Sequence, residues 1–418
     1  MLSVLVNAYA CSPGMGSEPG MAWNWCINLA KYCELYIITE GEFRDKIESA
    51  LPGLPQGKNM HFYYNPVPDK VRKMCWNQGD WRFYRYYRKW QWKTYLIAKE
   101  ICEQTHIDIL HQLNMIGFRE PGYLWKIENI PFVWGPIGGL KLFPLAYLRG
   151  AGWKLKVFNR VKNIISILQL KHSSRVDKAL RHSKILISSI PDSYRMIKEY
   201  KGLESVIIPE TGCYERNDGR RSAEKGTNPK MKMLWVGKFD FRKQLGLAIR
   251  TIAEIKDLNI ELVICGGGNE GQKQHYIQLA ENLGVSKLIR WKGNVDNSEV
   301  LREMQGADLF FFTSVSDDTS TVVMEAISNG LPVLCFDACG FGYVVNDTVG
   351  VKIPLSNPDQ SVREFAEKIK YLYAHRDVLH RLSIGCKQRQ KELSWDSKAR
   401  RMEELYNESI NGNSRDRY

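Results

Sequence analysis

The sequence lacks several features that would place the chain in a membrane or outside the cell. Its longest apolar runs, such as residues 164–168, are far shorter than the ~20 residues that a spanning helix needs. No basic segment and no small-residue cleavage site follow Met1, so we expect no signal peptide. The ten cysteines form no CxxC pair, and some, such as Cys265 and Cys335, lie in apolar runs. These absences favour buried reduced thiols over zinc sites or disulfides, and predict a cytoplasmic protein.

Acidic residues are scarce in two stretches, which concentrate the net charge of +13. Residues 71–100 interleave lysines and arginines with tryptophans and tyrosines, and residues 149–175 contain seven Lys and Arg residues and no acid. Cations beside aromatic rings suit an anionic membrane surface, and they also suit nucleic acid. A packed aromatic helix with a solvated basic face is the third interpretation, and the sequence leaves all three open.

The order of apolar runs predicts two α/β domains. At 418 residues the chain is too long for a single ordinary core. Strand-like runs alternate with helical patterns on both sides of a polar stretch, which is typical of doubly wound parallel sheets. We expect an N-terminal Rossmann-like domain, a linker, a second Rossmann-like domain and a last helix that braces domain one. Their ranges are 1–214, 215–232, 233–390 and 391–411.

The segment from Asp317 to Glu325 is predicted to combine two acids with the start of a helix. A strand ends at Phe312, a short loop follows, and a helix begins near Thr321. The free N–H groups at a helix start attract anions, so Thr319, Ser320 and Thr321 are candidate phosphate contacts. Asp317 precedes this anion site, and Glu325 lies about one turn into the helix, where a carboxylate can accept from a pair of hydroxyls. Ordinary acids at a helix N-terminus are the alternative interpretation.

This segment resembles the signature of two acids seven residues apart in retaining GT-B glycosyltransferases, particularly family 4. The matching residues are Glu325, Ala326, Gly330, Pro332 and Val333. Asp317 stands where the family has its first Glu, and Asp318, Thr319 and Ser320 replace the usual small glycines. The resemblance implies that Asp317 handles hydroxyls of the donor sugar and that Glu325 holds the nucleotide ribose.

Further segments resemble the same family in the same order. Residues 237–243 resemble its Gly-Arg…Lys element, with Lys238 in place of Arg and with Lys243 matching. Two cations there would clamp the donor diphosphate as negative charge builds on the leaving oxygen, so no metal and no other cofactor are expected. Gly16, in the loop after the first strand, is similar to a glycine that lies against the donor phosphate.

Other positions are nucleotide or acceptor candidates. Gly266 and Gly268 belong to a G-x-G-x-x-G run that lacks the acid of a dinucleotide site, and the resemblance makes them nucleotide-proximal. His111 ends a strand where the family keeps a histidine near the sugar, and we include it among the catalytic candidates. Residues 134–139 resemble an acceptor-side loop of one branch of the family, which points to Gly135, Gly138 and Gly139. The segment 393–396 resembles the family's C-terminal Ser-Trp element.

The predicted function is that of a retaining, metal-independent hexosyltransferase of the GT-B fold, with its active site between the two domains. We expect it to move a sugar from a nucleoside diphosphate sugar to a glycan or lipid-linked glycan, in surface polysaccharide synthesis. Peripheral contact with the inner face of an anionic membrane is expected, and no nucleic acid partner. The alternatives are a catalytically inactive nucleotide-sugar-binding protein of this fold, or a nucleotide-sugar epimerase on the same fold.

Overall fold

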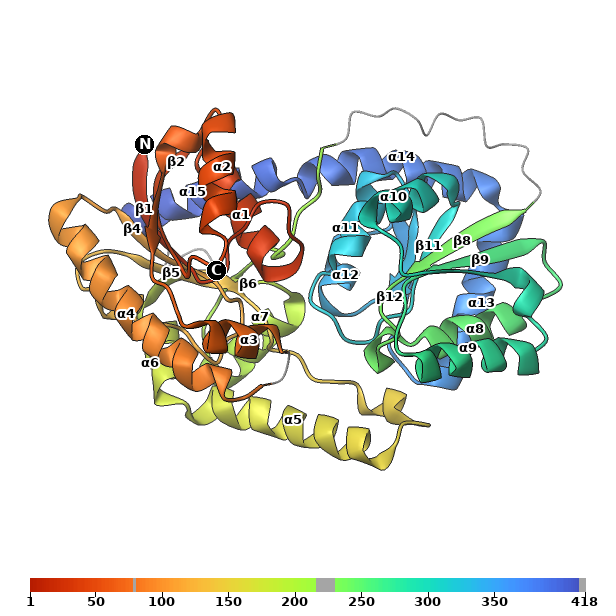
Figure 1. Cartoon of the computed structure of the whole chain (residues 1–418). Coiled ribbons are helices and arrows are strands. Elements are labelled where there is room, and N and C mark those ends of the chain that lie inside the picture. The colour runs from red at the N-terminus through yellow and green to blue at the C-terminus, as the bar shows by residue number, and fades with distance from the viewer. Residues whose placement is uncertain (78–79, 216–229, 413–418) are drawn as a thin grey trace. The chain divides into compact units, whose positions relative to one another are not determined.

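The computed structural model describes residues 1–77, 80–215 and 230–412, and these form two compact units (Figure 1). The N-terminal unit contains Met1–Lys141, Ile164–Glu210 and the described residues from Trp395 onward. The C-terminal unit contains Leu142–Asn163 and the described part of Thr211–Ser394. Most of the expected linker, residues 216–229, lies outside the described residues, and its last two residues already belong to a strand.

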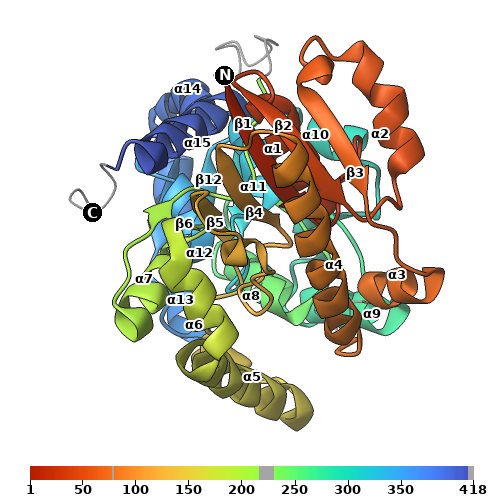
Figure 2. The same cartoon turned by 90° about the vertical axis from the view of Figure 1, so that its left-hand side faces the viewer.

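The N-terminal unit is built on a parallel sheet of seven strands in the order β3-β2-β1-β4-β5-β6-β7. Figure 2 shows β1, β2 and β3 side by side. Val4 in β1 pairs with Leu35 in β2 and with Ile109 in β4. The strands are β1 (Leu2–Ala8), β2 (Cys33–Thr39), β3 (Met60–Tyr64), β4 (Ile109–Asn114), β5 (Phe132–Ile137), β6 (Ser183–Ser188) and β7 (Val206–Ile207).

Helices cover both faces of this sheet, because successive side chains of a buried parallel strand point to opposite faces. In β1, Val4 and Val6 pack with α1 and α15, whereas Leu5 packs with α4, α6 and α7. The helices are α1 (Ser17–Leu29), α2 (Arg44–Ala50), α3 (Asp69–Trp76), α4 (Phe83–Gln104), α6 (Ser174–His182), α7 (Pro191–Lys201) and α15 (Trp395–Ile410). A further helix, α5 (Trp153–His172), begins among residues of the C-terminal unit and ends among residues of the N-terminal unit.

The last helix of the chain, α15, completes the N-terminal core. The Trp395 ring meets Trp25 of α1 edge to face, with ring centroids 5.9 Å apart. Lys398 Nζ donates to the Pro209 carbonyl, at 2.5 Å. The buried apolar side of α15 therefore packs within the N-terminal unit.

The C-terminal unit has a second parallel sheet, of six strands in the order β10-β9-β8-β11-β12-β13. Its strands are β8 (Met231–Val236), β9 (Ile260–Cys265), β10 (Ile289–Gly293), β11 (Leu309–Phe312), β12 (Val333–Phe336) and β13 (Gly350–Ile353). Its helices are α8 (Leu245–Ala253), α9 (Glu270–Asn282), α10 (Asn297–Gly306), α11 (Thr321–Ser328), α12 (Cys339–Val344), α13 (Pro358–Ala374) and α14 (Arg376–Glu392).

Both strand orders confirm the predicted fold class of two doubly wound parallel sheets. The order reverses between β1 and β4 in the N-terminal unit, and between β8 and β11 in the C-terminal unit. Ligands of such sheets bind beyond the carboxyl ends of the strands at this reversal. Each unit therefore places one candidate site in the loops that follow these strands.

Candidate active site

In the C-terminal unit the loop after β8 holds two cations at the reversal point. Asp240 begins the short 3-10 helix Phe241–Lys243, and its carboxylate accepts from the Arg242 backbone N–H at 3.1 Å. The Thr313 hydroxyl, at the end of β11, donates to the Lys243 carbonyl at 2.9 Å. The backbone that carries Lys243 is therefore fixed by contacts from both sides of the reversal point.

Asp317 lies against these two cations. Lys243 Nζ is 2.5 Å from Asp317 Oδ2, and Arg242 Nη1 is 3.2 Å from Asp317 Oδ1. The Arg242 Nε atom also contacts Asp240 Oδ2, at 2.7 Å. The side chains of Lys243 and Asp317 are 11% and 17% exposed, so their attraction is less screened than that of a surface pair. Two of the predicted residues, Lys243 and Asp317, thus come together, with Arg242 as a third member.

Arg242 was not among the residues predicted from the sequence, because the family resemblance names only Lys238 and Lys243, which lie on either side of it in the loop. The other predicted cation, Lys238, is exposed, and among the described residues no ion pair to it is found. No spacing rule indicates which of two neighbouring basic side chains will turn toward Asp317. The only sequence signal for Arg242 was its place directly before Lys243, a residue already predicted to contact the donor diphosphate.

The start of α11 is open on its outer side. No side chain caps this N-terminus, and Ser320 at the cap position has a φ of 72°, a left-handed value that is uncommon for a residue other than glycine. Thr319 is buried, whereas Thr321 is exposed. Backbone N–H groups in the first turn of a helix have no partner within the helix, and the helix dipole adds positive potential. This end of α11 can therefore take an anion.

Glu325 follows one turn later in α11. Its Oε1 accepts from the Asn297 side-chain amide at 3.1 Å, and Asn297 is the first residue of α10. Asn297 was not predicted from the sequence, since it lies 28 residues away from Glu325 along the chain. The contact joins the first residue of α10 to α11 at this carboxylate, and each oxygen of a carboxylate can accept more than one hydrogen bond.

The glycines after β9 are required by packing within the unit. A Cβ on Gly266, whose φ is 140°, would lie 1.8 Å from the Gly237 carbonyl oxygen. A Cβ on Gly268 would lie 2.9 Å from the Cβ of Phe239. Phe239 N–H donates to the Gly267 carbonyl at 2.8 Å, so the loop after β9 rests on the loop after β8. These contacts account for the glycines without a ligand, and their place beside the nucleotide stays a prediction.

In the N-terminal unit His111 is fully buried in β4. The Tyr406 hydroxyl donates to its Nδ1 at 2.6 Å, and its Nε2–H donates to the Gly135 carbonyl at 2.6 Å. Burial lowers the pKa of the imidazole to about 4, so the ring is neutral at physiological pH. Both nitrogens are engaged inside the protein, an arrangement that favours a structural role, and the catalytic role of His111 stays a prediction.

The glycines predicted as site residues in this unit differ in the space available beside their Cα atoms. A Cβ on Gly135 would lie 2.3 Å from the Ile187 carbonyl oxygen, and one on Gly138 would lie 2.8 Å from Ile116 Cδ1. Gly139 has a φ of 74°, which favours glycine. A Cβ on Gly16 would meet no protein atom within 4 Å, so protein packing does not require a glycine there. The space beside the Gly16 backbone is compatible with the close approach of a phosphate.

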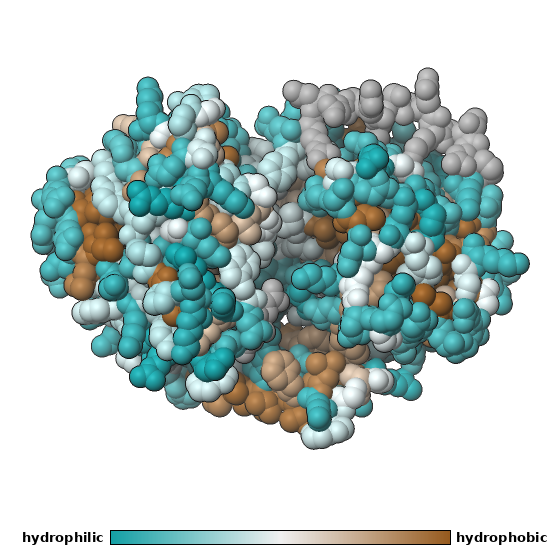
Figure 3. All heavy atoms as spheres, viewed as in Figure 1, coloured by the Kyte–Doolittle hydropathy of each residue, from teal (hydrophilic) through white to brown (hydrophobic). Residues whose placement is uncertain are grey.

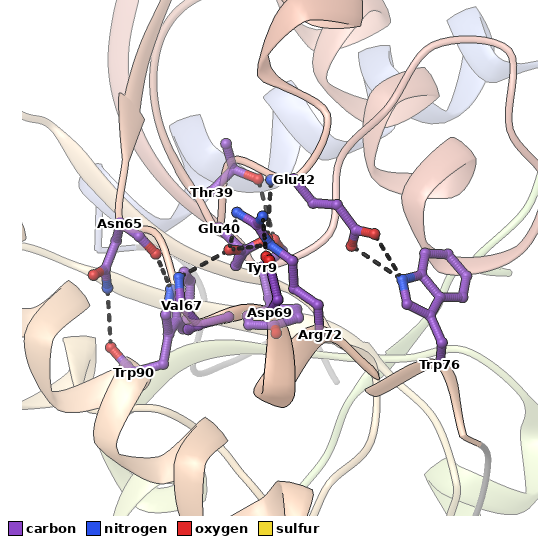
Figure 4. Close-up of polar contacts among 10 residues, drawn as sticks. All are labelled: Tyr9, Thr39, Glu40, Glu42, Asn65, Val67, Asp69, Arg72, Trp76 and Trp90. Carbon is purple, nitrogen blue, oxygen red and sulfur yellow. Dashed lines mark hydrogen bonds and ion pairs between the residues drawn. The ribbon is translucent and has the colours of Figure 1, made fainter. Parts of the chain in front are cut away.

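A pocket of about 180 Å³ follows β1 and β2 in the same unit. Glu40 is 3% exposed, and it accepts from the Arg72 guanidinium at 2.9 Å and from the Val67 N–H at 2.9 Å. The Trp76 ring N–H donates to Glu42 at 2.8 Å (Figure 4), and the half-exposed indole is part of the pocket lining. These contacts attach α3 to the end of β2. An exposed ring beside carboxylates suits the hydroxyls and apolar faces of a sugar.

The described residues contain neither a candidate metal site nor a candidate membrane span. Within the described ranges, no three His, Cys, Asp or Glu side chains are grouped so as to hold a metal ion. Of the helices that the structure describes, none combines the length and the apolar character needed to cross a membrane.

Comparison with known proteins places the C-terminal unit in one family. Residues 218–389 match the family model described as glycosyl transferases group 1. A D-inositol 3-phosphate glycosyltransferase of Corynebacterium diphtheriae is 23% identical over 184 residues, which cover 42% of this chain and 42% of that protein. The chain spans about half or less of the length of the first curated relatives that it matches.

Solved structures match the whole chain in fold. Sucrose-phosphate synthase of Thermosynechococcus elongatus has a TM-score of 0.66 at 14% identity, and the match covers 99% of this chain and 100% of that one. HepE of Anabaena, solved in complex with UDP, has a TM-score of 0.61 at 13% identity, with 97% and 100% covered. The resemblance seen in the sequence is thereby confirmed: residues 218–389 belong to the glycosyl transferases group 1 family, family 4 of the glycosyltransferases, and the chain has the GT-B fold.

Proposed function

We propose that the protein transfers a sugar, with retention of its anomeric configuration, from a nucleoside diphosphate sugar to a glycan or lipid-linked glycan. The observation that carries this proposal is the cluster of Lys243, Arg242 and Asp317 beside the N-terminus of α11. Cations and an open helix start are complementary to a diphosphate, and an acid next to them suits the hydroxyls of the attached sugar.

The chemistry that this cluster supports is departure of the nucleoside diphosphate. The bond between the anomeric carbon and the diphosphate oxygen breaks, and negative charge builds on that oxygen. Lys243 and Lys238 would stabilise this charge together with the start of α11, and Arg242 would orient Asp317. An acceptor hydroxyl attacks the anomeric carbon on the same face, and its proton passes to the departing diphosphate. Glu325 would accept from the ribose hydroxyls.

The donor base is proposed to be uracil, since HepE of the same fold was solved with UDP. The acceptor is proposed to bind the N-terminal unit, where the pocket beyond β1 and β2 presents Glu42 and Trp76. Surface polysaccharide synthesis is the process that we propose for a transferase of this kind.

Contact with an anionic membrane is part of the proposal, and the structure refines which side chains of residues 71–100 can make it. Among the tryptophans of this stretch, which we expected to meet the membrane surface, Trp90 is only 2% exposed, so that expectation is wrong for Trp90. Arg88 pairs with the buried Glu120 at 2.9 Å. By contrast, Lys89 and Lys93 are exposed along α4, one helical turn apart, and no acid pairs with them among the described residues.

A groove of about 790 Å³ runs beside these lysines. It has aromatic walls and basic edges, and its lining includes Trp81, Tyr84, Arg85, Lys89, Trp92 and Lys93. Rings of this kind lie among lipid headgroups, and cations contact their phosphates. The groove therefore fits the surface on which a lipid-linked acceptor is presented.

The proposed function is tested by mixing the protein with a panel of nucleotide sugars and measuring the released nucleoside diphosphate. Calorimetric titration of the same sugars runs in parallel. Binding together with release supports a transferase, and the anomeric configuration of the product reports retention. Binding without release on any acceptor supports the inactive alternative, conversion of the donor to an isomeric nucleotide sugar supports the epimerase, and the absence of binding contradicts the proposal.

A further inference from the structure

The helix α5 carries its apolar side chains on the outside. Trp153, Phe158 and Ile164 are 71%, 61% and 57% exposed, and Figure 3 shows hydrophobic residues gathered along this helix. At about 100° per residue, the exposed apolar residues of α5 fall within an arc of about 140°. The members of this stripe are Trp153, Val157, Phe158, Val161, Ile164, Ile165 and Leu168.

The buried side of α5 mixes apolar residues, such as Leu170 in the N-terminal core, with polar residues that are held by hydrogen bonds. Asn159 and Ser166 are 7% and 2% exposed, and the Ser166 hydroxyl accepts from Arg119 Nη2 at 2.7 Å. The Asn163 side chain accepts from the Phe143 N–H at 2.9 Å and donates to the Phe143 carbonyl at 3.0 Å. Specific hydrogen bonds thus help to hold the inner side, whereas about half or more of the surface of several stripe residues stays exposed among the residues that the structure describes. An apolar surface of this extent on a folded protein marks a site of contact.

The charge around the stripe indicates what it contacts. From Arg149 to Val176 the chain has no acid, and Lys154, Arg160 and Lys171 are exposed on α5. The Lys154 ammonium lies 5.9 Å from the centre of the Trp153 ring. A second copy of this helix would bring like charges together, which disfavours self-association. Phosphates of an anionic bilayer attract these cations, and acyl chains take up the apolar stripe.

We infer that α5 lies in the surface of an anionic lipid bilayer, with the stripe from Trp153 to Leu168 among the acyl chains. This inference rests on the proposed membrane contact and assigns the inserted segment, whereas the lysines of α4 contribute attraction at the headgroups. The helix lies in the plane of the interface, because Lys154 and Lys171 lie near the two ends of the stripe and Arg160 beside its middle, so that the cations are not gathered at one end.

The test measures partition of the full-length protein onto vesicles of phosphatidylcholine and phosphatidylglycerol. In one variant Phe158→Glu and Ile164→Glu are combined. The matched control combines Tyr371→Glu and Ile384→Glu, which change the charge equally at side chains that are 50% and 61% exposed. Burying one large apolar side chain corresponds to about a tenfold change in partition, so the α5 variant should bind about 100-fold more weakly. The control should bind nearly as wild type.

The outcomes separate this inference from the function on which it rests. If the α5 variant and the control partition equally onto the vesicles, the inference that α5 inserts is overturned. If only a variant that combines Lys89→Gln and Lys93→Gln then partitions more weakly onto the vesicles, the membrane contact is made by α4 alone. If the wild-type protein does not bind these vesicles, both the inserted helix and the proposed membrane contact are overturned. Self-association that is seen without lipid and lost in the α5 variant assigns the stripe to a second copy, against the inference. Nucleotide-sugar titration of the α5 variant checks that its donor site is unchanged.

Discussion

The Lys243 ammonium lies 2.5 Å from Asp317 Oδ2 and 4.9 Å from the centre of the Phe312 ring. The carboxylate and the ring face therefore hold the cation at the carboxyl ends of β8 and β11. A lysine held in this way need not lose much side-chain entropy when a diphosphate arrives, since its position is already fixed.

We predict that Lys243→Ala and Glu325→Ala each reduce transfer by on the order of 100-fold or more, because each removes a charged contact with the donor. Lys256→Ala and Glu254→Ala, at exposed positions of the same unit, are the matched controls. The measurement is initial rate with a natural donor, after circular dichroism has shown that all four variants are folded. Near-wild-type turnover of either site variant removes that residue from the site.

Transfer is expected to continue in EDTA. In the proposed site Lys243 and Lys238 would supply the positive charge that stabilises the leaving diphosphate, so that no divalent ion would be required. Rates are compared before and after chelation. Loss of activity that magnesium or manganese restores in full contradicts this arrangement of charge.

The fold was predictable from the sequence because buried parallel strands are continuous apolar runs. The run Leu309–Phe312, for example, is buried on both sides and ends at a polar loop. The strand Met60–Tyr64 was missed, since four of its five residues are only partly buried and its pattern is mixed. The helix α4 has no side-chain cap at Arg82, which removed the signal for its start.

The site was predictable only as far as the family resemblance extends. Asp317, Lys243 and Glu325 follow from motif spacing, whereas Arg242 and Asn297 are placed by the fold of loops far apart in sequence. Periodicity likewise shows that a helix is two-sided without showing which side is buried. For this reason only the structure shows that Asn159, Asn163 and Ser166 lie on the inner side of α5.

The buried His111 should make stability depend on pH. Its pKa is about 4 in the folded protein, lowered by burial, against 6.5 in a model peptide. Between these values the unfolded chain binds a proton that the folded one does not, so stability falls as pH decreases from 6.5 to 4. The loss should be about 3 kcal/mol.

Urea unfolding across this pH range measures the effect. The variant His111→Gln should lose this part of the pH dependence, and His172→Gln, at an exposed position of the same unit, should keep it. Equal pH dependence in His111→Gln and wild type would show that the ring is not buried neutral in solution.

Membrane binding is expected to weaken as salt rises, because the Debye length falls to ~3 Å at 1 M. Replacing Lys89 and Lys93 by Gln should lower binding by up to about 30-fold, at ~1 kcal/mol or less for each partly screened charge. Co-sedimentation with anionic vesicles at low and high salt measures both effects. The control neutralises Arg82, which already pairs with Asp80 at 2.7 Å, and should change binding less. Binding that is indifferent to salt would assign it to apolar contact alone.

The most direct test of the donor site is thermal unfolding of wild type and Lys243→Ala with a panel of nucleoside diphosphates that includes UDP. A ligand at ~100-fold above its dissociation constant stabilises the folded state by about 2.7 kcal/mol. We predict that at least one nucleoside diphosphate raises the unfolding temperature of the wild type and that the shift is largely lost in Lys243→Ala. No shift with any of them, or an equal shift in both proteins, would contradict a diphosphate site at Lys243.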